Sequence, residues 1–394
     1  MSPRPKILIV GGGIAGLCCA LQLARRGVAA MVCEKLPPAS SAGYIIGIWK
    51  NGFDVLEKLG VADLARQQGI TSDFQILTDP QNRAIRSTDM RALNEKYGAG
   101  VVFMNRGALV ECLLEELQKT GVADVHFNHS LSEIESQESK SRAVFASGEE
   151  EYCDLIIGAD GINSRVRRAV FGNRGEVTHN GVFYYAVVSM TEWESPLTGD
   201  VEMTGAGTFL GLYPFSRREC GIYAAVYRRP GLLSRPPSEV LREYFSGFSG
   251  YAPAVIDSCM TAEIFGDVIR EANAPRWCFE GGILIGDAAH AMLPTTGQGI
   301  SLALEDGYLS ANIIADSPQE KWAEQFAALE KSRRSRITPI RRRAALTNFV
   351  VNHTPSWLCP SRNTLIRLLA GNKSRGLDSF MADNVVRGET HGHD

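Results

Sequence analysis

Residues 6–35 read KILIVGGGIAGLCCALQLARRGVAAMVCEK, and this stretch decides the fold. It begins with a short apolar run, ILIV, which is typical of a buried strand. Glycines follow, and residues 17–26 then have the periodicity of a helix. A second apolar run, AAMVC, ends the stretch. The order strand, turn, helix, strand predicts a βαβ unit.

The turn of this unit has the pattern G-x-G-x-x-G. Gly11 allows the tight turn, Gly13 lets a pyrophosphate approach the backbone, and Gly16 permits close packing of helix on strand. Glu34 ends the second strand, where its carboxylate can accept hydrogen bonds from a ribose, which favours FAD or NAD over NADP. A glycine turn without a ligand is the simpler alternative. The agreement of strand, helix and acidic residue favours dinucleotide binding.

The bulk composition is that of a folded protein with balanced charge. The 394 residues predict two or three structural units, and the net charge of −3 implies no broad attraction to nucleic acid or anionic membranes. The basic run 331–343 is interpreted as a solvated, partly paired helix face. No apolar run is long enough to span a membrane, and the nine cysteines lack CxxC spacing. We expect a cytoplasmic protein without a metal site.

Changes of pattern divide the chain into four segments. Residues 1–175 carry the βαβ unit and further helices, and 176–271 offer strands separated by turns. Residues 272–345 return to helical pattern, and 346–394 are helical with prolines as breaks. The predicted fold class is α/β, with a Rossmann-like domain, an inserted and largely antiparallel β-sheet domain, and a helical C-terminal tail.

Two later stretches place an aspartate on a sharp turn after an apolar strand. They are DLIIGADGINSRVRR, residues 154–168, with Asp160, and LIGDAAHAMLPTTGQGIS, residues 284–301, with Asp287. Asp287 and His290 lie three residues apart, which raises a metal site or a catalytic dyad as alternatives. The surrounding glycines instead favour a loop shaped around a ligand, with His290 as a packing residue.

Together with GGGIAG near the N-terminus, these motifs resemble those of the flavin-dependent aromatic hydroxylases. This family comprises single-component FAD monooxygenases with the para-hydroxybenzoate hydroxylase fold. The resemblance covers roughly residues 5–345 and rests on three motifs in the same order. It implies an FAD-binding domain over 1–175 and 272–345, with part of the substrate domain near 70–100 and the rest over 176–271.

The resemblance also implies which residues bind the cofactor. Arg106 falls where the family has an arginine that reaches the flavin. Asp160 is similar to an aspartate that supports the flavin and the transient nicotinamide donor, and Asp287 to the residue that hydrogen-bonds the ribityl chain. The ADP half of FAD is expected at Gly11, Gly13, Ile14, Ala15, Gly16, Glu34 and Lys35, and the flavin half also at Gly47, Gly286, Pro294, Gly297, Gln298, Gly299 and Ile300.

The implied reaction needs no protein nucleophile. NADH or NADPH would reduce the FAD, the reduced flavin would take up O2 as a C4a-hydroperoxide, and one oxygen atom would pass to the substrate by hydroxylation or epoxidation. No second G-x-G-x-x-G follows a strand, so the nicotinamide is expected to visit only briefly. Two alternatives stay open: an FAD-dependent reductase or dehydrogenase without oxygen insertion, and a non-enzymatic FAD-binding redox sensor or scaffold.

The inserted sheet supplies the candidate substrate residues. Tyr184, Tyr185, Phe209, Tyr213 and Tyr223 are candidates for a pocket wall, with ordinary sheet packing as the alternative for each. Tyr185, Tyr213 and Tyr223 are the selected contacts. Since no charged constellation is evident, we expect a bulky, mostly apolar aromatic or polycyclic substrate of secondary metabolism. The tail from residue 356 is expected to pack against the FAD domain.

Overall fold

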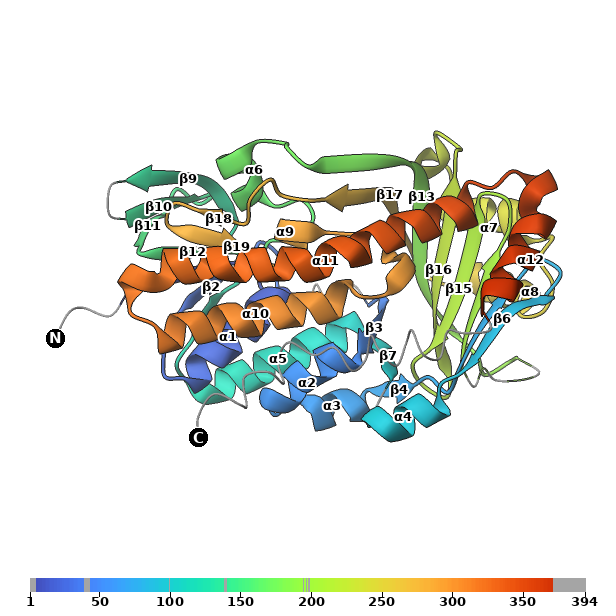
Figure 1. Ribbon diagram of the computed structural model, residues 1–394, viewed down its shortest axis with the longest axis horizontal. Helices are drawn as coiled ribbons and strands as arrows, with labels where there is room; N and C mark the ends of the chain where they lie inside the picture. Colours follow the sequence, from blue (N-terminus) through green and yellow to red (C-terminus); the bar gives the residue numbers. More distant parts are fainter. Residues whose placement is uncertain are drawn as a thin grey trace.

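The computed structural model describes residues 5–38, 43–98, 100–137, 140–193, 195, 197 and 199–370. Two large sheets lie side by side along the long axis of the molecule, joined by the long helix α11 (Trp322–Asn352) (Figure 1). The expectation for residues 371–394 of the C-terminal segment lies outside the described residues.

The first sheet contains the predicted βαβ unit. Its six strands have the order β18-β19-β12-β1-β2-β8, and all neighbours are parallel except β18 and β19. Short, fully apolar strands are expected here because helices cover a parallel sheet on its faces. The strands are β1 (Ile7–Val10), β2 (Met31–Cys33), β8 (Asp124–His126), β12 (Leu155–Gly158), β18 (Cys278–Phe279) and β19 (Gly282–Leu284).

Helices of this layer pack tightly because small residues face one another. A Cβ on Gly307 of α10 would lie 2.5 Å from the carbonyl oxygen of Ala15 in α1, so only glycine allows this approach. The two helices run side by side beneath α11 (Figure 1). The layer contains α1 (Ile14–Arg25), α2 (Lys50–Lys58), α3 (Ala62–Gln67), α5 (Arg106–Thr120), α9 (Asp287–His290) and α10 (Gly299–Asp316).

The second sheet is largely antiparallel, which confirms the predicted fold class. Its order is β17-β13-β16-β15-β14-β5-β6, and only β14 and β5 are parallel. Two strands of its edge come from early in the chain. The strands are β5 (Phe74–Thr78), β6 (Ala84–Asp89), β13 (Glu176–Ser189), β14 (Asp200–Thr204), β15 (Thr208–Pro214), β16 (Glu219–Tyr227) and β17 (Ile264–Ala272).

The two faces of this sheet differ. Along β13, Tyr184 and its alternate neighbours are buried with α7 (Pro237–Phe245) and α8 (Ala252–Cys259), whereas Phe183 and Tyr185 on the other face are half-buried. Tyr184 is 1% exposed and donates to the carbonyl of Leu232 at 3.4 Å. For Tyr184 the alternative of ordinary sheet packing therefore holds, because the residue belongs to the helix-covered face.

Smaller elements accompany the two large sheets. One antiparallel sheet has the order β3-β7-β4 and another β11-β10-β9, and α4 and α6 are short helices. Their bounds are β3 (Ile45–Trp49), β4 (Gly69–Thr71), β7 (Val101–Asn105), β9 (Leu131–Gln137), β10 (Lys140–Phe145), β11 (Glu150–Cys153), α4 (Arg91–Tyr97) and α6 (Arg165–Phe171).

The tail helix α12 (Cys359–Ala370) packs beside β6, at the edge of the second sheet. Buried Arg362 donates to the carbonyls of Val351 at 2.6 Å and Gly205 at 3.2 Å, and Arg367 donates to that of Ala84. The expectation that this tail packs against the FAD domain is therefore wrong for its described part, because its arginines bind carbonyls of β6, of the turn after β14 and of the end of α11. None of the described helices combines the length and apolar character needed to cross a membrane.

Candidate functional site

The glycine turn between β1 and α1 can exist only with glycine. Gly11 has φ of +113°, and a Cβ there would lie 2.4 Å from the carbonyl oxygen of Ala159. A Cβ on Gly16 would lie 2.0 Å from the carbonyl oxygen of Gly11. The first turn of α1 has no side-chain cap, so its backbone N–H groups and the positive end of its dipole are available to an anion. This cradle fits the pyrophosphate of a dinucleotide.

Glu34 is held beside the same turn. Its Oε2 accepts from the backbone N–H of Gly12 at 2.8 Å, and its Oε1 accepts from that of Leu36 at 3.0 Å. A carboxylate oxygen can accept more than one hydrogen bond, so this fixed carboxylate can also receive a ribose hydroxyl. Neighbouring Lys35 is exposed. The position fits the adenosine half of FAD.

Asp160 lies against Gly11 at the end of β12. Its Oδ2 accepts from the backbone N–H groups of Arg165 at 2.6 Å and Val166 at 3.2 Å, which fixes the start of α6. Its Oδ1 is buried and has no partner within the described chain. Burial raises the pKa of this carboxyl, and the hydrogen bonds of the α6 turn oppose that shift. A buried oxygen without a partner is an expected attachment point for a bound group.

Arg106 connects the glycine turn to the second sheet. It begins α5, and its Nη2 lies 3.7 Å from where a Cβ on Gly13 would be. Its guanidinium lies 5.4 Å from the ring centroid of Tyr44, and Tyr44 stacks on Tyr185 at 5.0 Å with an interplanar angle of 18°. Tyr44 was missed in the sequence, although an aromatic residue close to Gly43 and Gly47 was a usable signal.

Asp287 begins α9. Its side chain is accessible to water, yet the protein around it desolvates the carboxyl and raises its pKa, with His290 and Arg106 opposing the shift. Asp287 also acts electrostatically on Tyr44 and Tyr185, which places it near both rings. The structure therefore brings Asp287 and Arg106 together at one end of the aromatic face.

The loop after α9 brings the remaining predicted residues to this region. Pro294 starts a short 3-10 turn, Gly297 has φ of +62°, and Gly299 and Ile300 begin α10. A Cβ on Gly297 would lie 3.1 Å from Nε1 of Trp49, so the loop adjoins β3, which contains Gly47. Gln298 is buried, and its Oε1 has no partner among the described residues.

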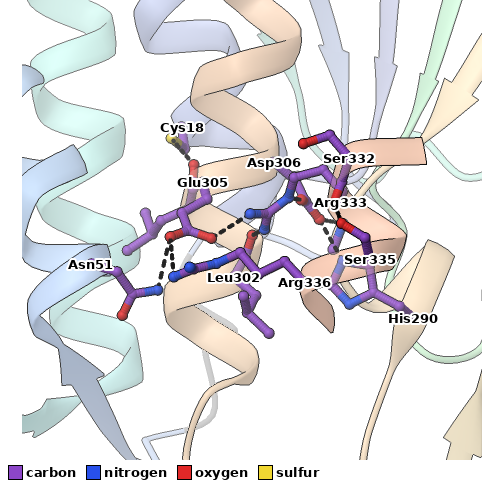
Figure 2. A network of polar contacts seen from close by, with 12 residues as sticks. Cys18, Asn51, His290, Leu302, Glu305, Asp306, Ser332, Arg333, Ser335 and Arg336 are labelled. Carbon is purple, nitrogen blue, oxygen red and sulfur yellow. Dashed lines mark hydrogen bonds and ion pairs between the residues drawn. The ribbon is translucent and has the colours of Figure 1, made fainter. Parts of the chain in front are cut away.

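His290 belongs to a buried ionic network (Figure 2), and its Nδ1 has no partner among the described residues. Its Nε2 lies 2.5 Å from Oδ2 of Asp306, which also accepts from the backbone N–H of Gly286 at 3.0 Å. Arg333 donates to Oδ1 of Asp306 at 2.7 Å and to Glu305 at 2.5 Å. Burial opposes the charge on Asp306, but Arg333 and His290 hold its pKa at about 2. The network fixes the turn that presents Asp287.

Burial of this network corrects one sequence interpretation. Arg333 lies within the basic run 331–343 but is only 1% exposed, so the run is not solvated at this residue. Within the described residues, no three His, Cys, Asp or Glu side chains gather as metal ligands would.

Tyr185, Tyr213 and Tyr223 share the face of the second sheet that meets Tyr44. The rings of Tyr185 and Tyr223 lie 5.1 Å apart, and Tyr213 lies 5.1 Å from Phe103 of β7. All three are largely enclosed by protein, and burial raises their pKa values. This aromatic face, defined by Tyr44, Phe183, Tyr185, Phe209, Tyr213 and Tyr223, begins beside Arg106 and Asp287.

A carboxyl pair on β14, Asp200 and Glu202, was missed in the sequence. Desolvation raises the pKa of Asp200 from 3.8 to about 7, with nearby Glu202 adding to the shift and a hydrogen bond from Ser72 opposing it. The available signal was two acidic residues at alternate positions of one short strand.

This shift predicts a pH dependence of stability. The folded protein keeps a proton on Asp200 between pH 3.8 and about 7, whereas the unfolded chain has released it, so stability falls as pH rises through this window. At pH 8 we expect the free energy of unfolding of Asp200→Asn to exceed that of the wild type by about 2–4 kcal/mol more than it does at pH 5. Denaturant unfolding at pH 5 and pH 8 measures this gain, with exposed Asp63→Asn as the control. Equal pH dependence of the wild type and Asp200→Asn would refute the assignment.

Comparison with known proteins agrees with this geometry. The FAD binding domain family matches residues 4–338. The chain is 26% identical over 378 residues to 6-hydroxynicotinate 3-monooxygenase of Pseudomonas fluorescens, covering 91% of this chain and 95% of that protein. It is 28% identical over 390 residues to 2-heptyl-3-hydroxy-4(1H)-quinolone synthase of Pseudomonas aeruginosa, covering 96% and 98%.

The fold is also shared with solved structures. Klebsiella pneumoniae HpxO, complexed with FAD and uric acid, superposes with a TM-score of 0.84 at 20% identity and 97% coverage of both chains. The expected cofactors, FAD with a nicotinamide donor and O2, are those of such monooxygenases. The chain therefore belongs to the FAD-dependent aromatic hydroxylase family and is an FAD-dependent monooxygenase.

Proposed function

We propose that this monooxygenase consumes NADH or NADPH and inserts one oxygen atom from O2 into a bulky, mostly apolar aromatic or polycyclic small molecule of secondary metabolism, by hydroxylation or epoxidation. The observation that carries the proposal is the aromatic face, which begins beside Arg106 and Asp287 and continues across β13, β16 and β15. Flat aromatic substrates stack on such rings and lose water on binding. The face supports an aromatic substrate rather than a small polar one.

The residues of the site have separable tasks in this proposal. Bound FAD supplies the redox chemistry with the nicotinamide and with O2. Glu34 and the glycine turn would bind the ADP half, and Arg106, Asp160 and Asp287 would orient the flavin half. The loop at 294–300 and the start of α10 would present backbone N–H groups to negative charge on the flavin. The aromatic face would hold the substrate and exclude water.

A cytoplasmic location is part of the proposal. All nine cysteines are free thiols, and seven of them are buried. Free thiols are typical of proteins in reducing compartments. Fractionation of the source cells, with the protein detected by antibody, tests the location, and recovery in a secreted fraction would contradict it.

The experiment that tests the function is a substrate screen on the yellow holoenzyme. We expect an aromatic or polycyclic compound to stimulate NAD(P)H oxidation and O2 uptake together, with a product heavier by one oxygen atom. Substrate-dependent NAD(P)H oxidation without oxygen in the product would support the reductase alternative. FAD binding without stimulation by any member of a broad panel would support the sensor alternative.

Asp287→Ala is expected to weaken FAD binding by about 10- to 100-fold, because a charged hydrogen-bond partner is lost. Titration of the apoprotein with FAD, followed by flavin fluorescence, measures the loss. Exposed Asp63→Ala on α3 is the control and should bind FAD like the wild type. Unchanged affinity in Asp287→Ala would remove this residue from the cofactor site.

A further inference from the structure

Glu202 lies in a cross-strand row on the aromatic face. Strand register pairs Glu202 with Gly211, Gly211 with Tyr223, and Tyr223 with Tyr185. Directly paired residues point to the same side of a sheet. Glu202 is therefore in line with the tyrosines that begin beside the cofactor residues, and it lies on β14, between β15 and β5 in the second sheet.

One of the two oxygens of Glu202 is already engaged. The hydroxyl of Tyr213 donates to Oε1 at 3.0 Å. Tyr213 reaches it by lying over Gly211, where an added Cβ would be 2.4 Å from the tyrosine hydroxyl. The glycine thus permits a ring position that holds Glu202 in one orientation, as a preorganised acceptor needs.

The other oxygen is left for a ligand. Within the described chain no residue donates to Oε2 of Glu202, and the residue is half-buried rather than closed off. Arg86 acts on it electrostatically from β6 but forms no ion pair with it among these residues, and the Nε of Arg86 is itself buried without a partner. A half-buried acceptor oxygen such as this one favours a ligand that donates a hydrogen bond to it. A ligand that presents only C–H groups there would leave the oxygen unpaired, which costs binding free energy.

We propose that Glu202 accepts a hydrogen bond from an N–H group on the ring system of the substrate, so that the substrates are N–H heteroaromatic compounds. This proposal rests on the proposed function and specifies its substrate class. A ring N–H would donate to Oε2 while the ring system lies along the aromatic face. Desolvation raises the pKa of Glu202, and Arg86 opposes that shift. A substrate carboxylate at this position would add a second carboxyl group to the same desolvated site, which disfavours benzoate-like anions.

Matched pairs of ring compounds test the proposal. Indole and N-methylindole, and carbazole and N-methylcarbazole, are titrated into the oxidised holoenzyme, and binding is followed by the change in flavin absorbance. We expect each N–H compound to bind about 10- to 100-fold more tightly than its N-methyl partner. Glu202→Ala should abolish this preference. The exposed Glu263→Ala is the control and should keep it.

Further variants keep the test decisive. Glu202→Gln preserves the shape and one acceptor oxygen but replaces the carboxyl group by a weaker amide acceptor. If the alanine variant does not fold, this variant should reduce the preference by about tenfold. Equal binding of both members of each pair to the wild type, or an undiminished preference in Glu202→Ala or Glu202→Gln, would overturn the assignment of Glu202. The proposed function fails by a different result, since it requires FAD binding and substrate-dependent O2 uptake.

Discussion

Arg333→Met is expected to lower the free energy of unfolding of the apoprotein by about 3–5 kcal/mol. Arg333 is 1% exposed and is the shared partner of Glu305 and Asp306, which are 0% and 2% exposed. Methionine has a similar volume but no charge, so two buried carboxylates would lose their cation. Asn51 and Arg336, the other donors to Glu305, cannot replace both contacts. Figure 2 shows the guanidinium of Arg333 between the carboxylates of Glu305 and Asp306.

Denaturant unfolding of the apoprotein measures this loss. Arg343→Met lies on the same helix at an exposed position and should change stability by less than about 0.5 kcal/mol. If the two variants had equal stabilities, the network would not stabilise the fold. Because Asp306 also binds the N–H of Gly286, we expect Arg333→Met to weaken FAD binding as well.

Gly16→Ala is expected to weaken FAD binding by about a hundredfold or more, equal to about 3 kcal/mol. The added Cβ would lie 2.0 Å from the carbonyl oxygen of Gly11, a backbone atom that can move only if the turn itself moves. The turn is the surface that would meet the pyrophosphate, so its displacement affects the cofactor more than the distant sheet.

FAD titration and thermal unfolding of the same variant separate these effects. Gly247→Ala is the matched control, because a Cβ there meets nothing within 4 Å and its φ is not left-handed. It should bind FAD normally. Normal FAD affinity in Gly16→Ala would show that the turn does not need the close approach we describe.

The cofactor-binding residues could be predicted from the sequence because their signals are local. Gly11, Gly16 and Glu34 fall within one βαβ unit, where chain connectivity alone fixes their neighbourhood. The later turns at Asp160 and Asp287 repeat the same strand-to-glycine pattern. The resemblance then named the family, and family comparison confirmed it.

The surroundings of the candidate substrate residues in the second sheet could not be predicted from the sequence in the same detail. Alternation along β13 separates Tyr184 from Tyr185, but which face receives helices is decided by α7 and α8, far along the chain. The neighbours of Glu202 are determined only when β14 pairs with β15 and β5. The position of helix α12 depends on hydrogen bonds from its arginines to carbonyls of β6, of the turn after β14 and of α11, and these contacts have no sequence signal.

We expect one atom of O2 to enter an aromatic substrate at this site. The most direct measurement is mass spectrometry of the product formed by the holoenzyme with NAD(P)H under isotopically heavy O2. We predict that the product gains one heavy oxygen atom. A product that carries oxygen from water instead, or no added oxygen despite substrate-dependent NAD(P)H oxidation, would contradict the account.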